Sequence, residues 1–240
     1  MIFARKHENG DAKQLETILE STETNPQVRE TVVEIFKAVE DTKKKHFNPL
    51  HIASYFKKHG MLVYTNHSPN DSELHVNGWK TQKLEGYSVH DAKGKDKIKR
   101  LLHQDGAIEV NAHNGTIDSY HRHIHVDIEE VALERKVIQT KEEKISSEKL
   151  GFDEKARMKL CKDKTYEGVG TKHHSALAAT AKDPRIYTVV LSEETGAITV
   201  MKDYKILYST IPTEVNPVYK QYLASNSHST QVLKTADCHA

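Results

Sequence analysis

Two short apolar runs constrain the fold of this chain most strongly, namely residues 61–65 (Met-Leu-Val-Tyr-Thr) and 187–191 (Tyr-Thr-Val-Val-Leu). Both are rich in β-branched and aromatic residues, which predicts strands buried in a sheet. Asn114-Gly115 predicts a hairpin turn between strands that begin at residues 107 and 116, because both residues tolerate positive φ. Glu194-Thr195-Gly196 predicts a second hairpin loop, with Gly at the left-handed position, which leads to strands over 197–201 and 205–208.

The first sixty residues have the period of helices instead. Apolar residues recur at i, i+3 and i+4 in two stretches that Asn25-Pro26 separates, since Asn caps a helix and Pro suits its first turn. Asn48-Pro49 begins a third predicted helix that ends at Gly60. Further helices are expected around residues 98–102 and, capped by Thr171, over 175–181. The pattern predicts an α/β fold, a single domain with a central mixed, twisted β-sheet flanked by helices, plus an N-terminal helical extension.

The expected organisation has three parts. Residues 1–45 form the helical extension, residues 46–212 the main domain, and residues 213–240 a polar C-terminal tail. Within the main domain, residues 128–165 are a dense run of mixed charge, which is typical of a solvated helical face or an excursion from the fold.

The charge balance excludes some function classes. The chain has 35 Lys and Arg against 34 Asp and Glu, a net charge of +1, so we expect neither nucleic acid nor a membrane surface as a partner. No stretch approaches the roughly 20 apolar residues of a membrane span, and no signal-peptide pattern opens the chain. Cys161 and Cys238 are too few for a disulfide framework. A cytoplasmic location is therefore expected.

Two segments combine ionisable side chains with special backbone chemistry. In Asp105-Gly106-Ala107, a carboxylate that could hold a divalent cation adjoins a glycine that lets a ligand approach the backbone, although for this segment alone an ordinary Asp-Gly turn is the better explanation. In 170–176 (Gly-Thr-Lys-His-His-Ser-Ala), a glycine, a hydroxyl and basic residues begin a helix, which is typical of an anion site. For this segment alone, a capped helix with exposed Lys and His is an equally good interpretation.

These two segments, followed by Ser192-Glu193-Glu194-Thr195-Gly196, resemble the diadenylate cyclase domain family in motif and order. That family makes cyclic di-AMP, a second messenger, from two molecules of ATP. Residues 55–63 (Tyr-Phe-Lys-Lys-His-Gly-Met-Leu-Val) are similar to the family's helix, glycine and first strand, and the Gly78 region fits the segment that follows. The resemblance covers about residues 45–212.

The resemblance implies a nucleotidyltransferase with the following site. Asp105 is expected beside the metal and the ribose 3′-hydroxyl, and the backbone of Gly106 and Ala107 beside the nucleotide. The residues implied to hold the triphosphate are Thr171, Lys172, His173 and His174, of which the last three are candidate catalytic residues. Ser192 is implied to contact the nucleotide, Glu194 to be a second carboxylate at the metal, and His123 and Ile124 to contact the adenine.

The resemblance also implies partners and a cofactor. ATP is the substrate, and the divalent metal is Mn²⁺, Mg²⁺ or Co²⁺. Because one domain binds one ATP, two must meet face to face in a homodimer or a higher homo-oligomer. The family normally has Arg-His-Arg where this chain has Lys172-His173-His174, and lysine keeps the charge without the bidentate fork. The gap of 66 residues between Asp105 and Thr171 is about double the family's, and 128–165 accounts for the excess.

Three functions from different classes stay open. The first is the cyclase, and the second is a nucleotide-binding module of the same fold without turnover, acting as a sensor or regulator. The third is a metal-dependent hydrolase, because His121, His123 and His125 alternate along a predicted strand and would share one face. The amphipathic helices within residues 11–45 lie outside the resemblance, and we expect them to set the assembly state.

Overall fold

The computed structural model describes residues 10–46, 60–67, 74–77, 82–101, 105–161, 166 and 168–224. The helix expected from Asn48 up to Gly60, the Gly78 region and the loop over 68–72 lie outside these residues, except for Gly60 itself. The labelled helices are α1 (Gly10–Thr22), α2 (Pro26–His46), α3 (Ala92–Arg100), α4 (Ile128–Glu134), α5 (Glu154–Leu160), α6 (Thr171–Lys182) and the short 3₁₀ helix η3 (Pro212–Glu214). The strands are β1 (Met61–Asn66), β2 (His75–Asn77), β3 (Gln82–Lys83), β4 (Ala107–Asn111), β5 (Ile117–His125), β6 (Tyr187–Leu191), β7 (Ile198–Lys202) and β8 (Lys205–Ser209).

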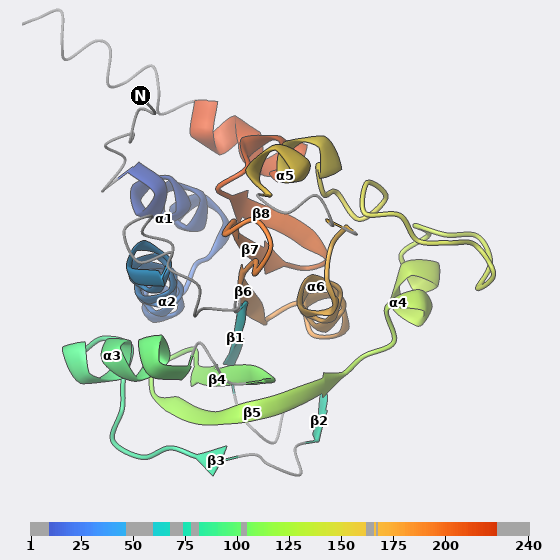
Figure 1. The fold of residues 1–240 in the computed structure, drawn as a ribbon. Coiled ribbons are helices and arrows are strands. Elements are labelled where there is room, and N and C mark those ends of the chain that lie inside the picture. Colours follow the sequence, from blue (N-terminus) through green and yellow to red (C-terminus); the bar gives the residue numbers. More distant parts are fainter. Residues whose placement is uncertain are drawn as a thin grey trace, which may run out of the picture.

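Within the described residues, eight strands form one mixed sheet in the order β2-β5-β4-β1-β6-β7-β8, with β3 also paired to β5. Only β1 and β4 pair in parallel, and the other pairs are antiparallel. Helices α1 and α2 cover one side of the sheet and α6 covers the other (Figure 1). The α/β fold expected from the sequence is confirmed. Within the same residues, no helix is both long and apolar enough to cross a membrane.

Strand β1 is covered on both faces of the sheet, so its sequence does not alternate between polar and apolar residues. All six of its residues are buried, and the first four, which are the apolar ones, alternate between two hydrophobic clusters. Met61 and Val63 belong to the cluster under α1 and α2, while Leu62 and Tyr64 belong to the cluster under α6. A strand covered on both faces is apolar throughout.

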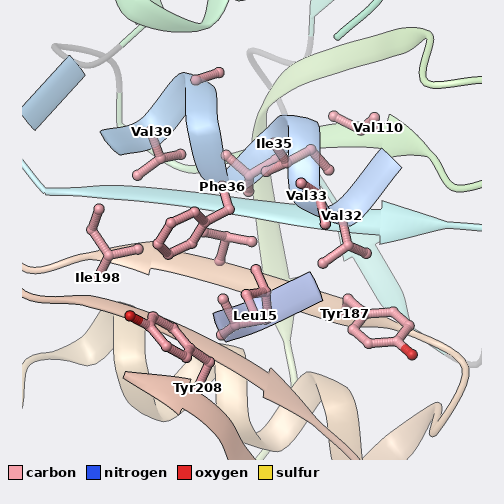
Figure 2. Close-up of a cluster of buried hydrophobic side chains, with 14 of the residues drawn as sticks. Leu15, Val32, Val33, Ile35, Phe36, Val39, Val110, Tyr187, Ile198 and Tyr208 are labelled. Carbon is pink, nitrogen blue, oxygen red and sulfur yellow. The ribbon is translucent and has the colours of Figure 1, made fainter. Parts of the chain in front are cut away.

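The two N-terminal helices share the main hydrophobic core. Figure 2 shows side chains of both helices gathered over the sheet, with Leu15 and Phe36 beside Ile198 and Tyr208. The rings of Phe36 and Tyr208 meet edge to face with centroids 5.5 Å apart. The segment expected as an extension is therefore packed into the domain that contains the sheet.

The corner between α1 and α2 follows the expected capping. Both Gln27 and Val28 donate their backbone N–H to Oδ1 of Asn25, at 3.0 and 3.4 Å. At Thr171, another predicted cap, the expectation is wrong. Helix α6 begins at Thr171, its N-cap is Gly170, and no side chain caps it. The hairpin after β4 also differs in detail, because the turn spans residues 112–115 and only Gly115 has positive φ.

The charged segment 128–165 is more than a solvated excursion. It includes α4, which packs on α6, and α5, and it buries several side chains: Val131, Ala132, Ile138, Leu150, Phe152 and Arg157. Residues 213–224, expected as the start of a polar tail, include η3 and a helix over 217–224, with Glu214 and Tyr219 buried. Composition alone did not predict either segment's burial, because both are polar on average.

Candidate functional site

The pairing of the strands brings separate segments to one end of the sheet. Leu62 of β1 pairs with Ala107 in parallel, and Met61 pairs with Leu191 in antiparallel. The start of β1, the start of β4 and the end of β6 therefore lie side by side. The chain before β4 contains Asp105, and the chain after β6 contains Ser192 to Glu194.

A pocket of about 100 Å³ opens beside this end of the sheet. It lies between the start of α6 and the turn after β6, and its lining residues are Gly170, Thr171, Lys172, His173, Leu191, Ser192, Glu193 and Glu194. Since no side chain caps α6, the first N–H groups of the helix are available to a ligand. The N-terminus of a helix with free N–H groups favours an anion.

Lys172 supplies the cationic side chain of this pocket. Its Nζ lies 3.8 Å from Oε2 of Glu193, and the same oxygen accepts a 3.4 Å hydrogen bond from the backbone N–H of Gly60. Gly60 is tightly placed, since a Cβ there would lie 2.9 Å from the carbonyl oxygen of Leu191. Glu193 and Gly60 were not among the predicted site residues, although Glu193 adjoins two that were.

Ser192 and Glu194 are bonded to each other. Ser192 is buried, and its hydroxyl donates to Oε2 of Glu194 at 3.0 Å and accepts from the N–H of Thr195 at 3.3 Å. The other oxygen of Glu194 lies against Gly170, 3.6 Å from where a Cβ would stand. Glu194 therefore joins the turn after β6 to the start of α6.

His173 does not present a charge to the pocket. Its side chain is buried, its ring meets Phe152 edge to face at 5.5 Å, and its Nε2 has no hydrogen-bond partner within the described residues. Burial, with the positive charges of Arg157, His174 and Lys172, holds the pKa of His173 well below its usual range. Burial also lowers the pKa of His174. At neutral pH, Lys172 is thus the one cation among the four residues expected to bind the triphosphate.

Asp105 and Gly106 stand at a distortion of the sheet. The side chain of Asp105 is exposed, and its carbonyl oxygen accepts a 2.8 Å hydrogen bond from Nδ1 of His121. Gly106 has a φ of +84°, and a Cβ there would lie 2.9 Å from the carbonyl carbon of His121. The close approach of β5 therefore requires glycine at 106, independently of any ligand.

The predicted row of three histidines is interrupted. Glu109 pairs with Ser119 and Ala107 pairs with Arg122, so β5 contains an extra residue between these pairs. His121 lies in this bulge with a φ of +61°, and the alternation of side chains does not continue through it. The expectation that His121, His123 and His125 share one face is therefore wrong. Among the described residues, no group of three or more His, Cys, Asp or Glu could hold a metal ion.

The residues expected at the adenine are separated by the sheet. Ile124 packs against the cluster under α6, the same cluster that contains the buried Ala107. His123, the preceding residue, is exposed, and successive side chains of a strand point to opposite faces. Only Ile124 thus lies on the face of the sheet that α6 covers.

The carboxylates suit a hard divalent cation in part. Asp105 is exposed, and no described residue forms a hydrogen bond or ion pair with its side chain, so its oxygens can take a metal ligand position. Glu194 already accepts a hydrogen bond from Ser192. Mg²⁺ and Mn²⁺ bind through one or two carboxylates plus substrate phosphates, so the free carboxylate of Asp105 has the chemistry that such an ion needs.

Comparison with solved structures gives distant likenesses. No family model and no curated protein matches the chain. A hypothetical membrane spanning protein from Bacillus cereus is similar with a TM-score of 0.41 and 15% identity, covering 75% of this chain and 63% of that one. A double mutant of DacA from Staphylococcus aureus is similar with a TM-score of 0.41 and 16% identity, covering 82% and 94%. The chain thus spans less than two thirds of the first protein's length, and the proposals below rest on its own residues.

Proposed function

We propose that this chain is a diadenylate cyclase, which condenses two ATP into cyclic di-AMP with release of two pyrophosphates. The observation that supports it best is the convergence of three motifs on one end of the sheet. β1 places Asp105 and Gly106 on one side and Ser192 to Glu194 on the other, while the start of α6 forms a pocket with the latter. These are the motifs on which the resemblance to the family depends.

The uncapped start of α6 and Lys172 would bind the β- and γ-phosphates. In the reaction, the 3′-oxygen of one ATP forms a bond to the α-phosphorus of the other, the bond to pyrophosphate breaks, and the hydroxyl proton is lost. Fixed N–H groups and Lys172 would stabilise the charge that develops on the departing pyrophosphate. Asp105 would face the 3′-hydroxyl from the start of β4.

A divalent cation, Mg²⁺, Mn²⁺ or Co²⁺, is proposed at Asp105, with Glu194 as a second carboxylate. Such an ion would neutralise phosphate charge and favour loss of the 3′-proton. The protein's part is to hold the two nucleotides in line. Since one chain offers one such pocket among its described residues, a two-fold homodimer that brings two pockets face to face is part of the proposal.

A second candidate is a nucleotide-binding module without turnover. The specific observation in its favour is the charge at the start of α6, where His173 is buried and neutral. Lys172 is also within 3.8 Å of the carboxylate of Glu193. One partly neutralised cation stabilises a leaving pyrophosphate less than two free arginines do.

The test is incubation of the purified protein with ATP and Mn²⁺ or Mg²⁺, followed by mass spectrometry for cyclic di-AMP. Asp105→Asn should abolish the product, whereas Glu85→Gln, which changes an exposed carboxylate outside the site, should leave it unchanged. Binding of ATP without product in any metal would favour the sensor. Product that persists in Asp105→Asn would contradict the role proposed for that residue.

A further inference from the structure

A buried ion pair lies behind the pocket and belongs to none of the motifs discussed above. Arg157 of α5 and Glu214 of η3 pair through both Nε–Oε1 and Nη2–Oε2, the latter at 3.0 Å, with side chains 1% and 0% exposed. Ser209 donates to Oε2 of Glu214 at 2.7 Å, and Thr199 accepts from Nη2 of Arg157 at 3.4 Å. The guanidinium is thus fixed from several sides.

One aromatic ring connects this pair to the pocket. The guanidinium carbon of Arg157 lies 4.9 Å from the centroid of the Phe152 ring, and His173 meets the same ring at its edge, 5.5 Å between centroids. Phe152 and His173 are both buried, so neither ring can move without disturbing the other. A shift of Arg157 would therefore displace the ring of Phe152 and, with it, the ring of His173, which lines the pocket.

The same segment supports the loop before α6. The position that a Cβ would take on Gly168 lies 3.3 Å from Oε1 of Glu154 and 3.5 Å from Oγ of Ser147. Gly168 has a φ of +104°, a backbone conformation that residues other than glycine rarely adopt. The segment that contains Ser147, Phe152 and Glu154 therefore lies against both Gly168 and His173.

We infer that Arg157, fixed by Glu214, is a positioning residue of the anion pocket, which acts through Phe152 on His173 and on the start of α6. The segment 128–165, which interrupts the resemblance to the cyclase family, then forms the rear wall of the site. The inference rests on the proposed function only in taking the anion to be a phosphate.

The variants are chosen to separate positioning from stability. Arg157→Met with Glu214→Gln removes both buried charges and keeps an acceptor for Ser209, so neither charge is left unpaired. Arg157→Lys keeps the charge without the fork. The matched control is Arg135→Met with Asp203→Asn, which removes a 3.0 Å ion pair that joins the same segment to the turn between β7 and β8 at the surface.

Two measurements are made on each folded variant. Calorimetry with inorganic pyrophosphate reports the affinity of the pocket, and NMR of the His173 imidazole reports its surroundings. In the double variant we expect pyrophosphate to bind about tenfold more weakly, because small displacements of binding groups are costly. We also expect the His173 ring to titrate closer to its ordinary range, because it loses the nearby charge and becomes better hydrated. The control should match the wild type in both.

The outcomes distinguish this inference from the proposed function. Unchanged affinity and an unchanged His173 signal in the folded double variant would overturn the inference and leave the cyclase untouched. Wild-type protein that binds pyrophosphate but makes no cyclic di-AMP would overturn the cyclase, and weaker binding in the double variant would still support the inference. If the double variant does not fold, the same two measurements on Arg157→Lys decide the question.

Discussion

The hydroxyl of Tyr187 donates a 2.7 Å hydrogen bond to the carboxylate of Glu23, 164 residues earlier in the chain. Lys202 donates to the same oxygen at 2.8 Å and to the Tyr187 hydroxyl at 2.6 Å. Glu23 lies between α1 and α2, and the other two residues begin β6 and end β7. This triad therefore ties the N-terminal helices to the middle of the sheet.

The triad predicts a loss of stability in acid. Burial alone would raise the pKa of Glu23, but hydrogen bonds from Lys202, Tyr187 and the Asn25 amide outweigh it and lower the pKa from 4.5 to about 2. Because the folded carboxyl has the lower pKa, its stabilisation is complete above about pH 4.5 and is lost as the pH falls towards 2. We expect Glu23→Gln to lower the free energy of unfolding at pH 7 by roughly 2 kcal/mol.

Urea unfolding at a series of pH values measures this effect. The difference between wild type and Glu23→Gln should shrink as the pH falls from 4.5 to 2. Glu20→Gln, which changes an exposed carboxylate in α1, is the control and should change little. An equal effect of both substitutions at pH 7 would contradict the role of the triad.

Phe36 gives a direct test of whether the N-terminal helices are part of the core. It is fully buried in α2 and packs edge to face on Tyr208 of β8. We expect Phe36→Ala to cost about 3–5 kcal/mol, because it leaves a cavity between helix and sheet. The urea midpoint should fall in a single transition, whereas Gln27→Ala, at an exposed position of α2, should leave it unchanged. A separate early transition would show that the helices unfold independently of the sheet.

Local chemistry explains which elements could be predicted from the sequence. Strands β1 and β6 were confirmed because both faces of each are buried, so their composition does not depend on any particular neighbour. The Asn25-Pro26 corner was confirmed because Asn25 caps α2 with its own side chain. Strands β2 and β3 were missed, since each is at most three residues long and only pairs along β5.

The parts of the site that could not be predicted depend on distant partners. Nothing near His121 in the sequence indicates a bulge, which arises from how β5 pairs with the chain at Gly106. Arg157 belongs to a charged run that is typical of a solvated face, and its burial depends on Glu214, 57 residues later. His173 was expected to bind phosphate, but the packing of Phe152 buries its ring.

The bulge beside Asp105 predicts that glycine at 106 is required for stability. Alanine there would have positive φ and would also collide with the backbone of His121, 2.9 Å away. Gly86 offers a matched control, because its φ is +73° and nothing lies within 4 Å of a Cβ there. We expect Gly86→Ala to cost about 1–2 kcal/mol from the backbone alone, and Gly106→Ala to cost clearly more. Equal costs in urea unfolding would mean that β5 moves aside freely.

If the pocket at the start of α6 binds anions as proposed, substitution of Glu193 should raise its affinity for them. Its carboxylate lies 3.8 Å from Nζ of Lys172 and also accepts from the N–H of Gly60, so it lies beside the groups that a phosphate would use. We expect Glu193→Gln to strengthen pyrophosphate binding roughly two- to fivefold, the range of an exposed ion pair. The gain should shrink at high salt, because Lys172 and Glu193 are both partly exposed.

Calorimetry with pyrophosphate at low and high salt measures this gain. Glu129→Gln changes the net charge equally at an exposed position of α4 and should leave the affinity unchanged. Weaker binding in Glu193→Gln would contradict the prediction, since it would mean that the carboxylate assists the anion, as a ligand of a bridging metal ion would. Stronger binding in Glu193→Gln, with unchanged binding in Glu129→Gln, would show that the carboxylate of Glu193 partly neutralises Lys172 until a phosphate displaces it.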